Sequence, residues 1–184
     1  MYPIQLSGSQ VILREFCSSD LDRALAVVGD DRVTESLSFD ARSRELAMEM
    51  LNGILNRAKQ EPRSEYYLAV DIVDGGVVGF ARLGLDGVQA AKLGYAIAAD
   101  YWGHGYATDA VLTLVDYGFR DLKLHRISAA MGPDNAASIA IARRLGMTYE
   151  GRIRDHVYTN GQWRDSLLYS VLANEWSQHR ELIS

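Results

Sequence analysis

The sequence predicts an α/β or α+β protein in which helices lie on the faces of a mixed, mostly antiparallel sheet. Three observations predict this class: a meander of β-rich runs in the first half, a strand–helix–strand–helix order after it, and a hairpin near the end. Hairpins make neighbouring strands antiparallel, whereas a helix between two strands allows them to be parallel. Amphipathic helices among such strands bury their apolar side against the sheet.

Composition and charge narrow the class of protein. With 184 residues, 48% of them hydrophobic and 23% charged, the chain has the composition of a globular protein and the size of one domain, residues 1–184. Its formal net charge of −5, without any Lys- or Arg-rich run, argues against nucleic acid as the main partner. The single cysteine, Cys17, excludes an intrachain disulfide and a multi-cysteine zinc site, and we expect no metal. Without a signal-peptide pattern or an apolar run of about 20 residues, we expect a cytoplasmic protein with no membrane partner.

The first half of the chain begins with a predicted strand and two predicted helices. Residues 10–16 alternate polar and apolar side chains, as a half-buried strand does. Residues 18–20 and Ser43 offer N-cap oxygens for two helical patterns, one through Val28 and one that Pro62 ends. The second helix repeats apolar residues at three- and four-residue spacing: Leu46, Met50, Leu51, Ile54 and Leu55.

A three-stranded meander follows these helices. Residues 65–73 and 77–85 are β-rich runs, and Asp74-Gly75-Gly76 between them suits a tight hairpin turn. Residues 88–98 make the third strand.

The second half continues with a helix, a strand, a shorter helix and a hairpin, at residues 107–122, 125–131, 135–145, 147–158 and 162–173. Gly146 follows the shorter helix as a C′ residue, and Thr159-Asn160-Gly161 forms the hairpin turn. The residues expected to be buried in the first of these helices are Ala107, Ala110, Val111, Leu114 and Val115.

The loop at residues 101–108 is the most informative segment, because it joins a predicted strand to a predicted helix through Gly103-His104-Gly105. Two glycines around one residue allow a tight turn, whose amides point outward at the positive end of the helix dipole, where a phosphate can bind. A Walker A loop would need Lys-Ser or Lys-Thr after Gly105, and a dinucleotide fingerprint would need glycine at Thr108. A plain turn without a ligand is the other interpretation.

The residues around this loop resemble motif A of the GCN5-related N-acetyltransferases (GNAT). The similarity continues in the family's order through later motifs: Leu93-Gly94-Tyr95-Ala96-Ile97-Ala98, His125-Arg126-Ile127, Asn135-Ala136-Ala137-Ser138-Ile139, Arg144-Leu145-Gly146-Met147, Glu150-Gly151 and Gly161-Gln162-Trp163-Arg164-Asp165. The chain looks like the branch with the ribosomal-protein alanine N-acetyltransferases and their small-molecule-modifying relatives. The resemblance implies one N-acetyltransferase domain with its core at residues 9–176 and a splayed central strand.

The resemblance implies acetyl-CoA as co-substrate. The splayed strand would end at Ile97-Ala98-Ala99, whose backbone groups would pair with the pantetheine amides. An N–H of Ile97 or Ala98 would polarise the thioester carbonyl. The family's loop usually begins with Gln or Arg, and Trp102 in that place leaves the pyrophosphate to backbone amides. Those amides belong to Trp102, Gly103, His104, Gly105, Tyr106, Ala107 and Thr108.

Asn135 and Ser138 are three residues apart on a predicted helix and are therefore neighbours on one face. In the resembled branch this Asn and Ser lie near the cofactor sulfur, and the Ser is credited with a hydrogen bond to the thiol. The alternative is that Asp134 or Asn135 caps the helix and Ser138 is a small packing residue.

The general base is left open. Well-known relatives use a glutamate four residues before the Asn-Gly of the last hairpin, where this chain has Val157. His156 beside it has a suitable intrinsic pKa, and strand alternation puts the two side chains on opposite faces. The base is then His156, a water chain or no group at all, and an isolated strand histidine is often only structural.

The acceptor site would lie under the loop at residues 34–40 and the helix after it, as the resemblance implies. Glu35 and Asp40 could pair with a cationic amine there, and Tyr67 could supply an aromatic wall. The alternative is a solvated polar loop with Phe39 packed into the core.

The predicted function is transfer of an acetyl group from acetyl-CoA to a primary amine, by direct transfer in a ternary complex. The acceptor is a small molecule or a protein N-terminus, and Val157 in place of the usual glutamate slightly favours the former. We expect a monomer or a homodimer. A non-catalytic acyl-CoA-binding module and a nucleotide-phosphate binder are the alternatives.

Overall fold

The computed structural model describes residues 2–73 and 75–183, and side chains only as far as residue 178. Its strands are β1 Gln5–Ser7, β2 Val11–Glu15, β3 Glu65–Ile72, β4 Gly76–Leu85, β5 Ala90–Ile97, β6 Arg126–Met131, β7 Thr148–Thr159 and β8 Gln162–Leu172. Its α-helices are α1 Leu21–Val28, α2 Asp31–Thr34, α3 Arg44–Ala58, α4 Tyr106–Arg120, α5 Ala136–Arg144 and α6 Ala173–Ile183. Short 3-10 turns, η1 Ser18–Asp20 and η2 Ala99–Tyr101, precede α1 and the glycine loop.

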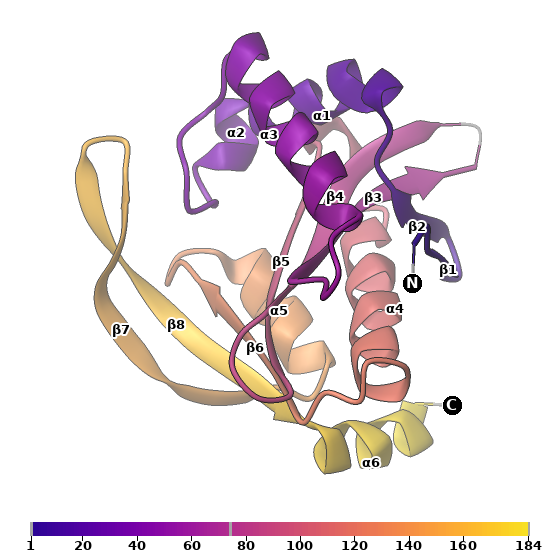
Figure 1. The fold of residues 1–184 in the computed structure, drawn as a ribbon. Coiled ribbons are helices and arrows are strands. Elements are labelled where there is room, and N and C mark those ends of the chain that lie inside the picture. The colour runs from indigo at the N-terminus through magenta and orange to yellow at the C-terminus, as the bar shows by residue number, and fades with distance from the viewer. Residues whose placement is uncertain (1, 74, 184) are drawn as a thin grey trace.

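All eight strands belong to one sheet, in the order β1-β2-β3-β4-β5-β6-β8-β7. Each neighbouring pair is antiparallel except β5 and β6, which are parallel (Figure 1). The predicted class, an α+β fold with a mixed and mostly antiparallel sheet, is therefore confirmed.

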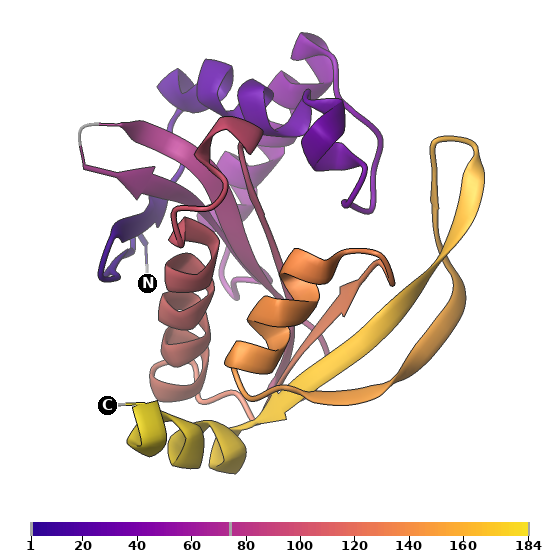
Figure 2. The same cartoon turned by 180° about the vertical axis from the view of Figure 1, so that it is seen from behind.

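Helices cover both faces of this sheet (Figures 1 and 2). On one face α4 and α5 enclose a core in which Leu13, Leu68 and Leu83 from the strands are fully buried. On the other face α1 and α3 pack over β3 and β4 around a second core that includes Ala69 and Phe80. The two cores use opposite faces of the same strands, as side-chain alternation requires.

Most predicted helix faces agree with the structure. In α4 the buried positions include Ala110, Val111, Leu114 and Val115 as predicted, whereas Ala107 is only partly buried. In α3 Ser43 caps the helix as predicted, with its Oγ accepting from the N–H of Leu46. The prediction was wrong for the Leu46 side chain, which is 44% exposed. The smaller Ala47 and Ala58 complete the buried face of α3 with Leu51 and Ile54.

Three elements were not predicted from the sequence: β1, α2 and α6. β1 and α2 are only three and four residues long, too short for a periodic pattern to be visible. Of the predicted turn between β3 and β4, Asp74 lies outside the described residues. No helix among the described residues is long and apolar enough to cross a membrane.

β5 and β6 separate soon after they begin. Their parallel pairing covers only three positions, which end at Lys92 opposite Ser128, while β5 continues to pair with β4 as far as Ile97. The second half of β5 therefore has one edge without a strand partner. This splay of the central strands lies in the middle of the sheet and points toward the glycine loop.

Candidate functional site

The loop between β5 and α4 has the backbone that its glycines predict. Gly103 has φ +79° and Gly105 has φ +85°, both in the left-handed region that favours glycine. Gly105 is the N-cap of α4, and a Cβ added to it would lie 3.2 Å from Nε2 of Gln10. The turn is therefore tight and depends on glycine at both positions.

The first turn of α4 presents unpaired amides. The N–H of Asp109 is the first to bond within the helix, to the carbonyl of Gly105 at 3.0 Å. The N–H groups of Tyr106, Ala107 and Thr108 therefore have no intrahelical acceptor, as at any helix start. Together with the helix dipole they form an environment suited to an anion.

A buried carboxylate fixes this end of α4 to the N-terminal hairpin. Asp109 accepts hydrogen bonds from three successive amides of the turn into β2, those of Ser9, Gln10 and Val11, at 3.0, 2.6 and 3.0 Å. Its neighbour Gly8 leaves room for this contact, because a Cβ there would lie 2.6 Å from Oδ2 of Asp109. The sequence analysis missed this residue.

Two side chains of the loop fold back onto it. Nδ1 of His104 lies 2.9 Å from the carbonyl oxygen of Trp102, and the imidazole ring stacks on Tyr106 with 5.5 Å between ring centroids. The indole N–H of Trp102 donates to the carbonyl of Ile97 at 2.8 Å. Trp102 thus joins the loop to the end of β5, a contact that the sequence did not predict.

At the end of β5 the predicted backbone groups are not equivalent. The N–H of Ala98 donates to Val78 at 2.8 Å, and its carbonyl accepts from Tyr101, so both groups are used within the fold. Because Ala98 and Val78 form a hydrogen-bonded antiparallel pair, the N–H of Ile97 points to the other edge, into the splay. Of the two predicted donors only Ile97 is therefore available. Ala99 accepts from the N–H of Trp102 at 3.2 Å.

Gly79 of β4 sets the close approach of the two strands at this point. It lies opposite Ile97, and a Cβ on Gly79 would lie 2.2 Å from the carbonyl oxygen of Ala96 and 3.0 Å from Cα of Ile97. No side chain fits without moving the backbone that carries the Ile97 N–H. Glycine within a strand often signals such an approach, but the sequence does not show which strand lies opposite.

Across the splay, α5 begins with the predicted pair. Asn135 is the N-cap, and its Oδ1 accepts from the N–H of Ser138 at 3.0 Å. The capping interpretation of Asn135 is therefore correct, and it fixes Ser138 in the first turn of α5. Burial raises the pKa of the Tyr95 phenol in β5.

His156 lies in an irregular part of β7. The pairing of β7 with β8 is interrupted between Ile153 and Val157, and Asp155 within this bulge has φ +46°. The bulge interrupts the regular strand alternation from which opposite faces for His156 and Val157 are predicted. His156 is exposed, and its Nδ1 lies 2.9 Å from Oγ of the buried Ser166.

The predicted acceptor residues are held by two parts of the fold: Glu35 and Asp40 lie in a loop against the β7–β8 hairpin, and Tyr67 packs in the second core. The carboxylate of Asp40 accepts from the N–H of Asn160 at 2.7 Å, so it links the loop to the β7–β8 turn. Glu35 is exposed, and its backbone carbonyl accepts a hydrogen bond from Arg164 of β8. Arg164 also donates to the carbonyl of Leu37, so this side chain and Asp40 together hold the loop against the hairpin.

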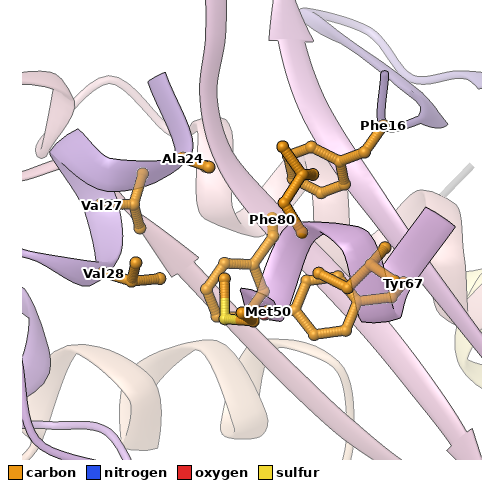
Figure 3. A pocket seen from close by; sticks show the side chains of 10 residues that line it. Phe16, Ala24, Val27, Val28, Met50, Tyr67 and Phe80 are labelled. Atoms are coloured by element: carbon orange, nitrogen blue, oxygen red, sulfur yellow. The ribbon is translucent and has the colours of Figure 1, made fainter. Parts of the chain in front are cut away.

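Tyr67 belongs to the second core rather than to an open wall. Its ring lies 4.9 Å from that of Phe80 and 6.2 Å from that of Phe16, and burial raises the pKa of its phenol. Figure 3 shows these rings around a narrow apolar cavity between α1, α3 and the sheet, with Met50 beside them. The cavity has no charged or hydrogen-bonding lining apart from the phenol, so Tyr67 is a packing residue here.

Comparison with known proteins decides the family. Residues 10–148 match the family described as the acetyltransferase (GNAT) domain. The chain belongs to the GNAT acetyltransferase family. The predicted acyltransferase class is confirmed: the chain is an acetyl-CoA-dependent N-acetyltransferase.

Three relatives of this GNAT chain each cover 70% or more of its length. The uncharacterized N-acetyltransferase YoaA of Bacillus subtilis is 30% identical over 178 residues, which cover 94% of this chain and 98% of YoaA. The [ribosomal protein uS5]-alanine N-acetyltransferase of Escherichia coli is 28% identical over 131 residues, or 70% of this chain and 68% of that enzyme. The structure of Mycobacterium smegmatis RimJ in complex with CoA-disulfide aligns with a TM-score of 0.85 at 23% identity. The alignment covers 100% of this chain and 96% of RimJ.

Proposed function

We propose that this GNAT enzyme transfers the acetyl group of acetyl-CoA directly to a primary amine held in the same complex. The observation that carries the proposal is the junction of the β5–β6 splay with the glycine loop. It combines an open strand edge, a directed N–H at Ile97 and the unpaired amides of Tyr106, Ala107 and Thr108.

The residues present fit the shape and charge of acetyl-CoA. The positive φ angles of Gly103 and Gly105 make a tight turn, and the amides of residues 103–108 on it suit a pyrophosphate. The predicted amide of Trp102 is not among them, because it already donates to the carbonyl of Ala99. The edge of β5 without a strand partner can bind an extended amide chain, as a strand would be bound, which suits pantetheine. Asn135 and Ser138 lie across the splay at the start of α5.

Acetyl-CoA supplies an activated thioester, and the chain's own groups orient and polarise it. The N–H of Ile97 is placed to donate to the thioester carbonyl oxygen, where negative charge develops as the amine attacks. This donor is fixed before the reaction, because Gly79 and the β4 pairing hold the strand behind it. A fixed donor requires little reorganisation and therefore lowers the barrier to attack.

Replacing Ser138 by alanine should slow turnover about tenfold, with little change in acetyl-CoA affinity. The reason is that the Ser138 hydroxyl would donate to the departing sulfur, whereas the N–H contact with Asn135 remains. Steady-state kinetics and calorimetric titration of the same variant measure the two effects. An unchanged kcat would return Ser138 to a packing role.

His156 is the proposed base for the acceptor amine. With Nδ1 engaged by Ser166, Nε2 is the nitrogen left to accept a proton. In a His156→Gln variant we expect kcat/KM to fall about 100-fold. An unaltered kcat/KM would exclude His156 and leave a water chain or binding of the free amine.

For the acceptor, the relatives and the residues point to a primary amine on a protein N-terminus or a small molecule. One relative is named for the N-terminal alanine of ribosomal protein uS5, which favours a peptide amine. Val157 in place of the branch's usual glutamate slightly favours a small molecule. Glu35 remains the carboxylate proposed to attract a cationic amine, since that of Asp40 is already engaged.

Release of the CoA thiol across a panel of amines and N-terminal peptides tests this function. Turnover with any acceptor supports the enzyme and excludes a non-catalytic acyl-CoA-binding module. Tight CoA binding without turnover on the whole panel would instead favour that module. Binding of ATP or NAD with indifference to CoA would favour a nucleotide-phosphate binder.

A further inference from the structure

The bulge in β7 lies opposite a single residue of β8. Regular pairing on its two sides ends at two pairs, Ile153 with Ser166 and Val157 with Arg164. Residues 154–156 therefore face Asp165 alone. Asp155, in the middle of the three, has φ +46°, a left-handed value that costs energy for a residue with a side chain. Three residues opposite one cannot all join the ladder of backbone hydrogen bonds, so the bulge needs another partner to keep its shape.

The carboxylate of Asp165 supplies that partner. Its Oδ1 accepts from the N–H of Asp155 at 2.9 Å, and its Oδ2 accepts from Nε of Arg152 at 2.5 Å. The Asp155 amide and the Arg152 guanidinium hold the pKa of this carboxyl below its ordinary value, so Asp165 is ionised and acts as an acceptor only. A side chain of β8 thus takes the place of the strand carbonyl that the N–H of Asp155 would otherwise bond.

The bulge lets the His156 ring reach back along β8. His156 directly precedes Val157, the partner of Arg164, yet its Nδ1 lies 2.9 Å from Oγ of Ser166, two residues farther along β8. Because Ser166 is buried, this contact holds the ring against the sheet at a fixed point.

Ser166 also determines on which face of the sheet the ring lies. Val171, five residues later on β8, belongs to the core under α4 and α5, so strand alternation puts Ser166 on the opposite face together with Arg164. Arg164 binds the carbonyls of the loop at residues 35–37. The His156 ring is therefore held on the side of the sheet where the acceptor is proposed to bind.

We propose that Asp165 is a positioning residue that holds the β7 bulge so that the His156 ring stays on Ser166, with Nε2 left for the acceptor amine. Nδ1 then carries a proton that it donates to Oγ of Ser166, and the lone pair of Nε2 takes the proton that the amine loses on attack. Asp165 touches no substrate in this scheme, because it acts through the backbone of Asp155. The inference rests on the proposed role of His156 as base.

An Asp165→Ala variant should lower kcat/KM about tenfold for the best acceptor of the amine and peptide panel, with unchanged affinity for acetyl-CoA. Asp165→Asn should recover most of this loss, because an amide oxygen can still accept from the N–H of Asp155. In a His156→Gln background Asp165→Ala should cost nothing more, since Asp165 acts through His156. The control is Asp86→Ala, which removes an exposed carboxylate paired with Lys92 at 2.8 Å and should leave turnover unchanged.

Nitrogen NMR of the histidine rings tests the positioning without any acceptor. The chain has four histidines, and the His156→Gln variant identifies the His156 signals by their loss. We expect the ring proton on Nδ1 in the wild type and in Asp165→Asn, and loss of this preference in Asp165→Ala, where the ring leaves Ser166.

Two sets of outcomes separate this inference from the proposed function. A wild-type ring proton on Nε2, or unchanged His156 signals in Asp165→Ala, would overturn the inference, and so would a further loss of turnover in the double variant. Unchanged kcat/KM in His156→Gln, with the ring signals as expected, would instead overturn the proposed role of His156 as base.

Discussion

A Gly105→Leu variant should lose about 100-fold or more in acetyl-CoA affinity, equivalent to roughly 3 kcal/mol. Gly105 has φ +85° at the N-cap of α4, and an added Cβ would lie 3.2 Å from Gln10. A leucine there must either strain the backbone or rotate the peptide that orients the amides of Tyr106 and Ala107. Calorimetric titration with acetyl-CoA measures the loss directly.

Gly87→Leu is the matched control for Gly105→Leu. Gly87 has φ +72° in the turn between β4 and β5, and a Cβ there would meet no atom within 4 Å among the described residues. The Gly87→Leu variant should therefore lose about as much folding stability as Gly105→Leu while keeping its affinity for acetyl-CoA. Equal affinity in a folded Gly105→Leu protein would show that the loop does not bind the phosphates.

A Gly79→Ala variant should lower kcat about 100-fold, the size expected when one donor to a developing oxyanion is displaced. The methyl group would overlap the carbonyl of Ala96 and crowd Cα of Ile97, both backbone atoms that can move only if the end of β5 moves. The Ile97 N–H would then leave its position in the splay. Single-turnover kinetics at saturating acetyl-CoA isolate this effect from binding.

Gly84→Ala on the same strand is the control for Gly79→Ala. Its Cβ would meet only the flexible end of Arg82, at 2.8 Å from Nη2, so the backbone can stay in place. We expect near-normal kcat for this variant. If Gly79→Ala also turned over normally while remaining folded, Ile97 would not be the oxyanion donor.

The sequence predicted the parts of the molecule that follow from local pattern. Period-two and three- to four-residue spacings gave the long strands and helices, and Gly103 and Gly105 marked a turn whose φ angles are indeed positive. Ser43 was predicted as a cap, and Asn135 was one of two candidate caps, because capping depends on residues only three positions away. The glycine loop could be located because its turn also depends on neighbouring residues.

The parts that sequence did not predict depend on contacts between distant segments. Asp109 meets residues about a hundred positions earlier, and Arg164 binds a loop that is even farther from it in sequence. The β7 bulge interrupts the strand alternation around His156, although nothing in the residue pattern marks the bulge. Gly79 acquires its role only because of the strand opposite it.

The central claim, that the Ile97 N–H faces the thioester of acetyl-CoA in the splay, is tested most directly by amide NMR of the wild-type protein. Spectra are recorded with acetyl-CoA and with CoA, two ligands that differ only by the acetyl group. We expect both ligands to shift the amide signals of residues 103–108, whereas the Ile97 amide signal should shift strongly only with acetyl-CoA. An Ile97 amide that is unmoved by acetyl-CoA, or moved equally by both ligands, would contradict it.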